Sequence, residues 1–138
     1  MKRQGGFTLI EMVVVIVILG ILAVTAAPKF VSMQEDAKTG ALNGLKASVV
    51  SASEIGRAQK LMNKNSSVTV KNGYPDGLPT GIVSLVDLGN DFEAVLAGTP
   101  STDSKVEFKF KGGSDNCVVY TPAASKDVRP NVEVKACS

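Results

Sequence analysis

The chain has 138 residues, a formal charge of +2 and no histidine. Its length predicts a single domain, and the lack of histidine excludes the Ser-His and Cys-His arrangements of many hydrolases. Neither a glycine-rich phosphate loop nor a zinc motif is present. No basic cluster exceeds the row formed by Lys105, Lys109 and Lys111, so nucleic-acid binding is not expected. We therefore expect a protein that is not an enzyme and that has no cofactor and no metal site.

A long apolar run lies near the N-terminus. Residues 7–28 are uncharged apart from Glu11, and as a helix they would span about 33 Å, close to the ~30 Å hydrocarbon core of a membrane. Lys2 and Arg3 precede the run without an acidic residue, which favours a cytoplasmic N-terminus. A Sec-type signal peptide and a simple signal anchor are two possible interpretations. Neither explains Glu11, because a charge at mid-membrane costs about 2.5–3.5 kcal/mol.

The motif around Glu11 resembles that of a known family. Residues 2–11 read KRQGGFTLIE, and with the apolar run that ends at Pro28 they resemble the N-terminus of type IV prepilins. The resemblance covers about the first 30 residues. It implies that a prepilin peptidase cuts after Gly6 on the cytoplasmic side and methylates the new N-terminus at Phe7. This cut would remove residues 1–6 as a leader peptide and leave 13 basic and 13 acidic side chains.

Cleavage would give Glu11 a possible partner. The new amine of Phe7 is mostly cationic near neutral pH, and an unpaired charge in apolar surroundings is very costly. The partner is either the amine of the same chain or that of a neighbouring subunit. We hypothesise that the neighbour's amine sets the axial register of a filament; the alternative is that protonation neutralises Glu11. Gly20 and Pro28 weaken the helix, and the resemblance implies that helix between them melts in the filament, the alternative being a plain kink.

Residues 29–63 are predicted to continue the helix in amphipathic form. Apolar residues recur every three or four positions. The predicted buried face contains Phe30, Met33, Ala37, Ala41, Leu45, Ala52, Ile55, Ala58 and Met62, with Ser48 between Leu45 and Ala52. Gly40, Gly44 and Gly56 are either points of close packing or points of flexibility. A helix over residues 7–63 would be about 85 Å long, so we expect its N-terminal half to project from the domain.

Residues 64–104 are predicted to form a connecting loop region. The helix should end at residues 63–66, and residues 67–71 should form a short strand that ends at the turn formers Asn72 and Gly73. Residues 82–88 fit either a short helix or a buried strand. Residues 91–96 are predicted as a helical turn, with Phe92, Val95 and Leu96 facing inward.

Four polar side chains in this region, Asp87, Asn90, Asp91 and Glu93, carry oxygen atoms that suit calcium. Their spacing is not that of an EF-hand loop. We therefore interpret them as capping groups and solvated surface.

Residues 105–138 are predicted to form a sheet. Residues 105–111 alternate strictly, which indicates a half-buried antiparallel strand with Val106, Phe108 and Phe110 facing inward and charged residues facing solvent. Residues 117–121 and 132–137 predict two more strands, separated by a loop at residues 122–130.

Cys117 and Cys137 are the two cysteines of the chain. A single pair in a small exported domain predicts a disulfide, which is worth about 3 kcal/mol in the chain-entropy model. A metal site would need more ligands. Type IV pilins carry a similar disulfide in their C-terminal region.

The predicted architecture is α+β and of the type IV pilin kind: a long N-terminal helix packs on a small antiparallel sheet, with a disulfide-bounded C-terminal region. Residues 1–6 would be the leader, residues 7–28 the transmembrane and filament-core helix, and residues 29–138 the globular domain.

The resemblance implies that the chain is the major subunit of a type IV pilus. Its partners would be further copies of itself, the prepilin peptidase and methyltransferase, and the pilus assembly machinery. It would reside in the inner membrane with its N-terminus in the cytoplasm and then in an extracellular filament.

Within this family, the Gly6-Phe7 junction, residues 13–18 and the compact cysteine-bounded end are most similar to the mannose-sensitive haemagglutinin pilin. That similarity implies surface adhesion and biofilm formation. The alternatives are a minor pilin, a membrane-anchored binding domain, or the major pseudopilin of a type II secretion system. Major pseudopilins share the same N-terminus but commonly lack the cysteine pair.

Overall fold

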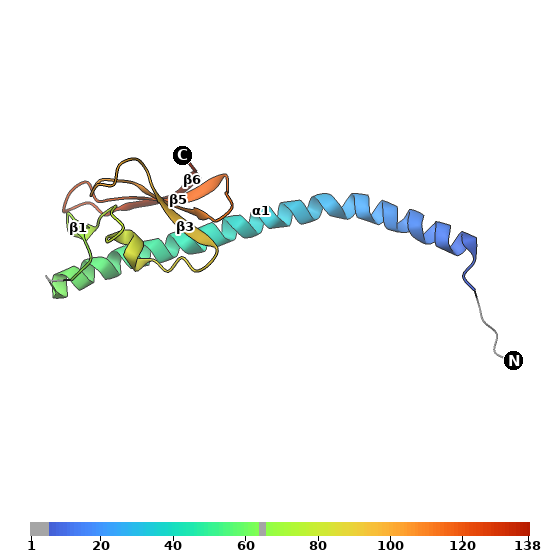
Figure 1. Cartoon of the computed structure of the whole chain (residues 1–138), viewed down its shortest axis with the longest axis horizontal. Helices are drawn as coiled ribbons and strands as arrows, with labels where there is room; N and C mark the ends of the chain where they lie inside the picture. Colours follow the sequence, from blue (N-terminus) through green and yellow to red (C-terminus); the bar gives the residue numbers. More distant parts are fainter. Residues whose placement is uncertain (1–5, 64–65) are drawn as a thin grey trace. The chain divides into compact units, whose positions relative to one another are not determined.

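The computed structural model describes residues 6–63 and 66–138, which form a long helix, a small hairpin and a four-stranded sheet (Figure 1). The elements in chain order are α1 (Leu9–Met62), β1 (Val70–Lys71), β2 (Tyr74–Pro75), the 3₁₀ helix η1 (Ile82–Leu85), β3 (Phe92–Leu96), β4 (Val106–Phe110), β5 (Asn116–Thr121) and β6 (Asn131–Ala136). The predicted α+β type IV pilin fold is confirmed: an N-terminal helix is followed by antiparallel sheet and a C-terminal disulfide.

The chain divides into two compact units, Met1–Thr39 and Gly40–Ser138. In the first unit the large apolar side chains of α1 are 48–82% exposed. The helix contains a window with a mean hydropathy of 2.8, and it is long and apolar enough to cross a membrane. A helix that is apolar on every face requires lipid or other apolar helices around it.

In the described structure α1 continues through Gly20 and Pro28. Pro28 lacks a backbone N–H, so it removes one hydrogen bond from the helix. One turn earlier, the Thr25 hydroxyl donates to the carbonyl oxygens of Ile21 (3.3 Å) and Leu22 (3.0 Å). Both helix-weakening residues therefore lie within helix in the single subunit.

In the second unit, the buried face of α1 differs from the predicted one. It consists of Leu42, Leu45, Val49, Ala52, Ser53 and Gly56. Only Leu45 and Ala52 belong to both faces, whereas Phe30, Ile55 and Met62 are 65%, 54% and 81% exposed. The other members of the predicted face are exposed as well: Met33, Ala37, Ala41, Ser48 and Ala58.

Close approach of neighbouring elements explains this correction. A Cβ atom on Gly56 would lie 2.4 Å from Leu85 Cδ1 and 2.5 Å from Pro75 Cγ. A Cβ on Gly40 or Gly44 would meet no atom within 4 Å. Of these three glycines, Gly56 is the point of close packing, where Pro75 of β2 and Leu85 of η1 approach the helix.

The four-stranded sheet has the order β3-β4-β5-β6, with every neighbouring pair antiparallel. The prediction of a helical turn at residues 91–96 is wrong, because these residues include β3, which pairs with β4 from Phe92↔Phe110 to Leu96↔Val106. Phe92, Ala94 and Leu96 alternate toward the core, and Val95 is 38% exposed. Period-two burial is the pattern of a strand with one buried face.

The core lies between the second half of α1 and the inner face of the sheet. It contains Leu42, Leu45, Val49, Ala52, Ile82, Val86, Val106, Phe108, Val118, Tyr120 and Val132. The predicted inward direction of Val106 and Phe108 is confirmed, and Phe110 packs against the core at its edge.

The connecting region forms a hairpin and a 3₁₀ helix. Asn72 and Gly73 both have positive φ angles, 54° and 84°, which fits the two-residue turn between β1 and β2. The predicted strand at residues 67–71 is shorter, at Val70–Lys71. Residues 82–85 adopt the helical alternative. The helix ends at Met62 as predicted, whereas Lys64 and Asn65 lie outside the described residues.

Buried polar groups connect this region to the sheet. The Tyr120 hydroxyl donates to the Pro75 carbonyl oxygen at 2.5 Å. Oδ1 of buried Asp76 accepts from Thr69 Oγ1 at 2.8 Å and from the Leu78 amide at 3.0 Å. Burial raises the pKa of the Tyr120 hydroxyl well above its usual value, and the nearby Asp76 charge raises it further.

Candidate functional site

The predicted cleavage junction lies just before the helix. Gly6 and Phe7 are exposed and have no regular secondary structure, and the Phe7 side chain is 82% exposed. The Gly6-Phe7 peptide bond therefore lies on exposed, non-helical backbone. The rest of the predicted leader, including Lys2 and Arg3, lies outside the described residues.

Glu11 lies in the first turn of α1 and is held by Thr8. Its carboxylate oxygen Oε2 accepts from the Thr8 backbone amide and from the Thr8 hydroxyl, each at 2.8 Å. In return, the Glu11 amide donates to Thr8 Oγ1 at 3.3 Å. This reciprocal pair is a capping box, in which the N-cap and N3 residues satisfy each other's free backbone amides.

The surroundings of Glu11 are apolar. A shallow groove of about 350 Å³ is lined by Glu11 together with Phe7, Ile10, Val14 and Val15. This arrangement places a carboxylate at the edge of an apolar surface, where it can attract a cation carried on an apolar segment. An α-amine at the start of a similar apolar helix would be such a cation.

The predicted site residues form two groups along α1. Gly6, Phe7 and Glu11 lie together at its start, whereas Gly20 is nine positions beyond Glu11, about 14 Å along the helix. Pro28 lies farther still. The sequence interpretation gave Thr8 no role, although the T-x-x-E spacing from Thr8 to Glu11 is a recognisable capping-box signal.

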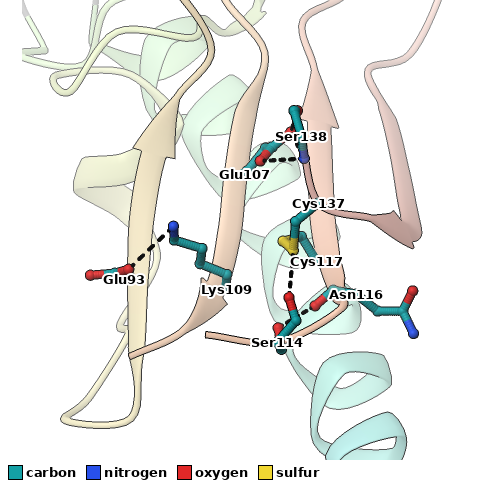
Figure 2. The surroundings of a disulfide bond; sticks show 8 residues. All are labelled: Glu93, Glu107, Lys109, Ser114, Asn116, Cys117, Cys137 and Ser138. Atoms are coloured by element: carbon teal, nitrogen blue, oxygen red, sulfur yellow. Dashed lines mark hydrogen bonds and ion pairs between the residues drawn. A yellow bond between two sulfur atoms is a disulfide. The ribbon is translucent and has the colours of Figure 1, made fainter. Parts of the chain in front are cut away.

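The predicted disulfide between Cys117 and Cys137 is present in the second unit (Figure 2). The Cα atoms are 5.2 Å apart, within the usual range for disulfides. Cys117 is fully buried on β5, and the Cys137 amide donates to the Asp115 carbonyl oxygen at 3.1 Å. The bond thus fixes the segment after β6 onto the sheet.

The outer face of β4 is less exposed than predicted. Glu107 is 7% exposed, because the C-terminal segment covers it, and its carboxylate accepts from the amide and the hydroxyl of Ser138 (Figure 2). Lys109 is partly exposed, with its ammonium 3.6 Å from Glu93 on β3. Lys105 and Lys111 are exposed, as the prediction of a solvated row requires.

Two of the four residues considered for calcium, Asp87 and Glu93, have other partners. Asp87 Oδ1 accepts from the Gly89 amide at 3.0 Å, which agrees with the capping interpretation. Glu93 pairs with Lys109. Within residues 6–63 and 66–138, no three His, Cys, Asp or Glu side chains are grouped so that they could hold a metal ion.

Comparison with known proteins gives similarities that are limited to part of the chain. Residues 1–27 match the family model described as the prokaryotic N-terminal methylation motif. The type IV narrow pilus major component PilA5 of Thermus thermophilus is 44% identical over 57 residues, which are 41% of this chain and 49% of that protein. The type II secretion system core protein G of Pseudomonas aeruginosa is 49% identical over 43 residues, which are 31% of this chain and 30% of that protein.

The matched segments thus span about half of the first relative and less than a third of the second. No solved structure matches the chain. The motif and the two relatives support the type IV pilin and pseudopilin class. They do not distinguish a pilin from a pseudopilin, and they show no particular similarity to the mannose-sensitive haemagglutinin pilin.

Proposed function

We propose that this chain is the major structural subunit of a type IV pilus, which polymerises through its apolar N-terminal helix. The observation that carries the proposal is the N-terminal methylation motif at residues 1–27, joined to a helix whose apolar side chains are exposed on every face. A carboxylate in the first turn of such a helix, Glu11, has no use in a simple membrane anchor.

Processing comes first in the proposed sequence of events. Lys2 and Arg3 hold the N-terminus in the cytoplasm, and a prepilin peptidase cleaves after Gly6 and methylates the amine of Phe7. Exposure of the non-helical Gly6-Phe7 junction supports this step, because a peptidase binds backbone that is free of helical hydrogen bonds. Cleavage removes the two leader cations and creates a cationic amine next to the apolar helix.

Assembly then transfers the helix from lipid to the filament core. Lipid tails are as apolar as neighbouring helices, so this transfer by itself gives little preference for one axial register over another. A charge pair in apolar surroundings is strongly dependent on position. We therefore propose that Glu11 pairs with the Phe7 amine of a neighbouring subunit and so fixes the register. Helix loss between Gly20 and Pro28 in the filament belongs to the same proposal.

The choice between a true pilin and a pseudopilin rests on the C-terminal end of the chain. The Cys117–Cys137 disulfide favours a true pilin, and the sequence resemblance to the mannose-sensitive haemagglutinin pilin favours surface attachment and biofilm formation. The second candidate is the major pseudopilin of a type II secretion system, which the similarity to core protein G supports. Electron microscopy of cells with and without the gene separates the two. Thin surface filaments that depend on this chain support the pilin, whereas unchanged filaments with failed secretion support the pseudopilin.

The test of the assembly step is replacement of Glu11 by Gln, with Glu35→Gln as a matched control. Glu35 is an exposed acid on the same helix that lies outside the apolar run. We expect Glu11→Gln to abolish filaments while mature subunits remain in the membrane, and Glu35→Gln to leave filament yield unchanged. Mass spectrometry of the mature chain should find methylated Phe7 at its N-terminus. Normal filament yield from Glu11→Gln would contradict the proposal.

A further inference from the structure

We propose that Thr8 is the positioning residue for Glu11. In the single subunit it satisfies one carboxylate oxygen, and it orients the other toward the amine of the incoming neighbour. The inference rests on the proposed filament function and adds Thr8 to it, as a residue that acts through Glu11.

Two hydrogen-bond donors of Thr8 converge on one carboxylate oxygen of Glu11. The Thr8 amide and the Thr8 hydroxyl both donate to Glu11 Oε2 at 2.8 Å. Within the described residues, no hydrogen bond ends on the second oxygen, Oε1. Hydrogen bonds to an ionised carboxylate are among the stronger ones, so the side chain is restricted to an orientation in which Oε1 stays available.

The same pair of residues fixes where the helix starts. The Glu11 amide donates to Thr8 Oγ1 at 3.3 Å, and the Met12 amide donates to the Thr8 carbonyl oxygen at 3.3 Å. Thr8 thus satisfies free amides of the first turn while Glu11 satisfies the amide of Thr8. The position of the carboxylate relative to the helix axis is set by this reciprocal contact.

The contact does not depend on the leader peptide. Both donors belong to Thr8, which follows the proposed cut between Gly6 and Phe7, so cleavage leaves the capping box in the mature subunit. The Phe7 nitrogen, by contrast, changes from an amide to an amine at that step. A carboxylate that is already oriented by Thr8 can therefore accept the neighbour's amine at Oε1 without a change in its own helix.

Three variants at two positions test the inference in the full-length chain. Thr8→Val removes the hydroxyl and keeps the shape of the side chain, and Thr8→Ser restores the hydroxyl. Thr25→Val is the matched control, because it removes a hydroxyl from the same apolar helix that, within the described residues, donates to backbone carbonyls and not to a carboxylate. Loss of one hydrogen bond of this kind is expected to lower filament yield per mature subunit about fivefold in Thr8→Val. Thr8→Ser and Thr25→Val should stay close to the unmodified chain.

A second measurement separates positioning from a purely structural effect. The carboxyl carbon of Glu11, labelled with carbon-13 and observed by NMR in detergent micelles, should shift in Thr8→Val and should not shift in Thr8→Ser or Thr25→Val. A lower filament yield with an unshifted carboxyl signal would overturn the inference, because Thr8 would then act on the helix alone. Normal assembly of Thr8→Val together with failed assembly of Glu11→Gln would overturn the inference and leave the proposed function intact. Normal assembly of both variants would contradict the proposed function itself.

Discussion

Two glycines on the same helix should respond to alanine in opposite ways. Gly44 and Gly56 both lie in α1 within the second unit. Alanine in a helix interior is about 1 kcal/mol more favourable than glycine, and at Gly44 the added Cβ meets no atom within 4 Å. At Gly56 the Cβ would overlap Leu85 Cδ1 at 2.4 Å and Pro75 Cγ at 2.5 Å. The Leu85 side chain can move, but the Pro75 ring cannot rotate away.

The expected magnitudes follow from these two environments. Gly44→Ala should raise the free energy of unfolding by about 1 kcal/mol. Forcing extra atoms into a packed interior costs about 1–3 kcal/mol, so Gly56→Ala should lower it by about 1 kcal/mol after the helix gain is subtracted. The two variants should therefore differ by about 2 kcal/mol, which shifts the urea midpoint by roughly 1 M for a small domain.

Urea denaturation of the full-length chain in detergent micelles measures this difference. The chain has no tryptophan and two tyrosines, and both Tyr74 and Tyr120 are buried in the second unit. Tyrosine fluorescence therefore reports on that unit alone. If Gly56→Ala stabilised the unit as much as Gly44→Ala, α1 would not pack closely on Pro75 and Leu85, and the assignment of the buried face would be refuted.

Three further changes test the second unit. Replacing Cys117 and Cys137 together by alanine should lower the free energy of unfolding by about 3 kcal/mol, measured by urea denaturation, because the open loop regains entropy in the unfolded chain. Asp76→Ala should cost about 2 kcal/mol in the same assay by removing the acceptor of Thr69 Oγ1, whereas Asp76→Asn, which keeps an acceptor, should cost less than half of that. The pKa of Tyr120 is raised in the folded state, so its contribution to stability is complete below about pH 10 and is lost as the pH rises toward the folded pKa. The urea midpoint of the unmodified chain should therefore fall in strongly alkaline solution, and that of Tyr120→Phe should fall less.

The parts of the structure that the sequence predicted well depend on local signals. The start of α1 at Leu9 lies close to the start of the apolar run at Phe7, which only Glu11 interrupts, and its end follows from the polar residues after Met62. The pairing of Cys117 with Cys137 had no competing cysteine. Each of these features is specified by residues that are close in sequence or unique in the chain, so no knowledge of distant contacts was needed.

The errors occur where distant parts of the chain decide the outcome. β3 looks like a helical turn in isolation, and it becomes a strand because Phe92 to Leu96 pair with β4 and place alternate side chains on the core. Glu107 follows a solvated pattern, yet it is 7% exposed, and the amide and the hydroxyl of Ser138 donate to its carboxylate. Thr8 is a different case, since its signal is local and was present in the sequence.

The periodicity of apolar residues did not predict which residues of α1 are buried, and two alanine substitutions test the buried face that the structure shows. The buried face predicted from the sequence includes Ile55 but not Leu42. In the structure Leu42 is 3% exposed and Ile55 is 54% exposed. Because a buried leucine leaves a cavity when it is truncated, Leu42→Ala should cost about 2–5 kcal/mol, whereas Ile55→Ala should change stability by less than about 0.5 kcal/mol. Both values are measured by urea denaturation with tyrosine fluorescence. A larger loss from Ile55→Ala than from Leu42→Ala would restore the face predicted from the sequence.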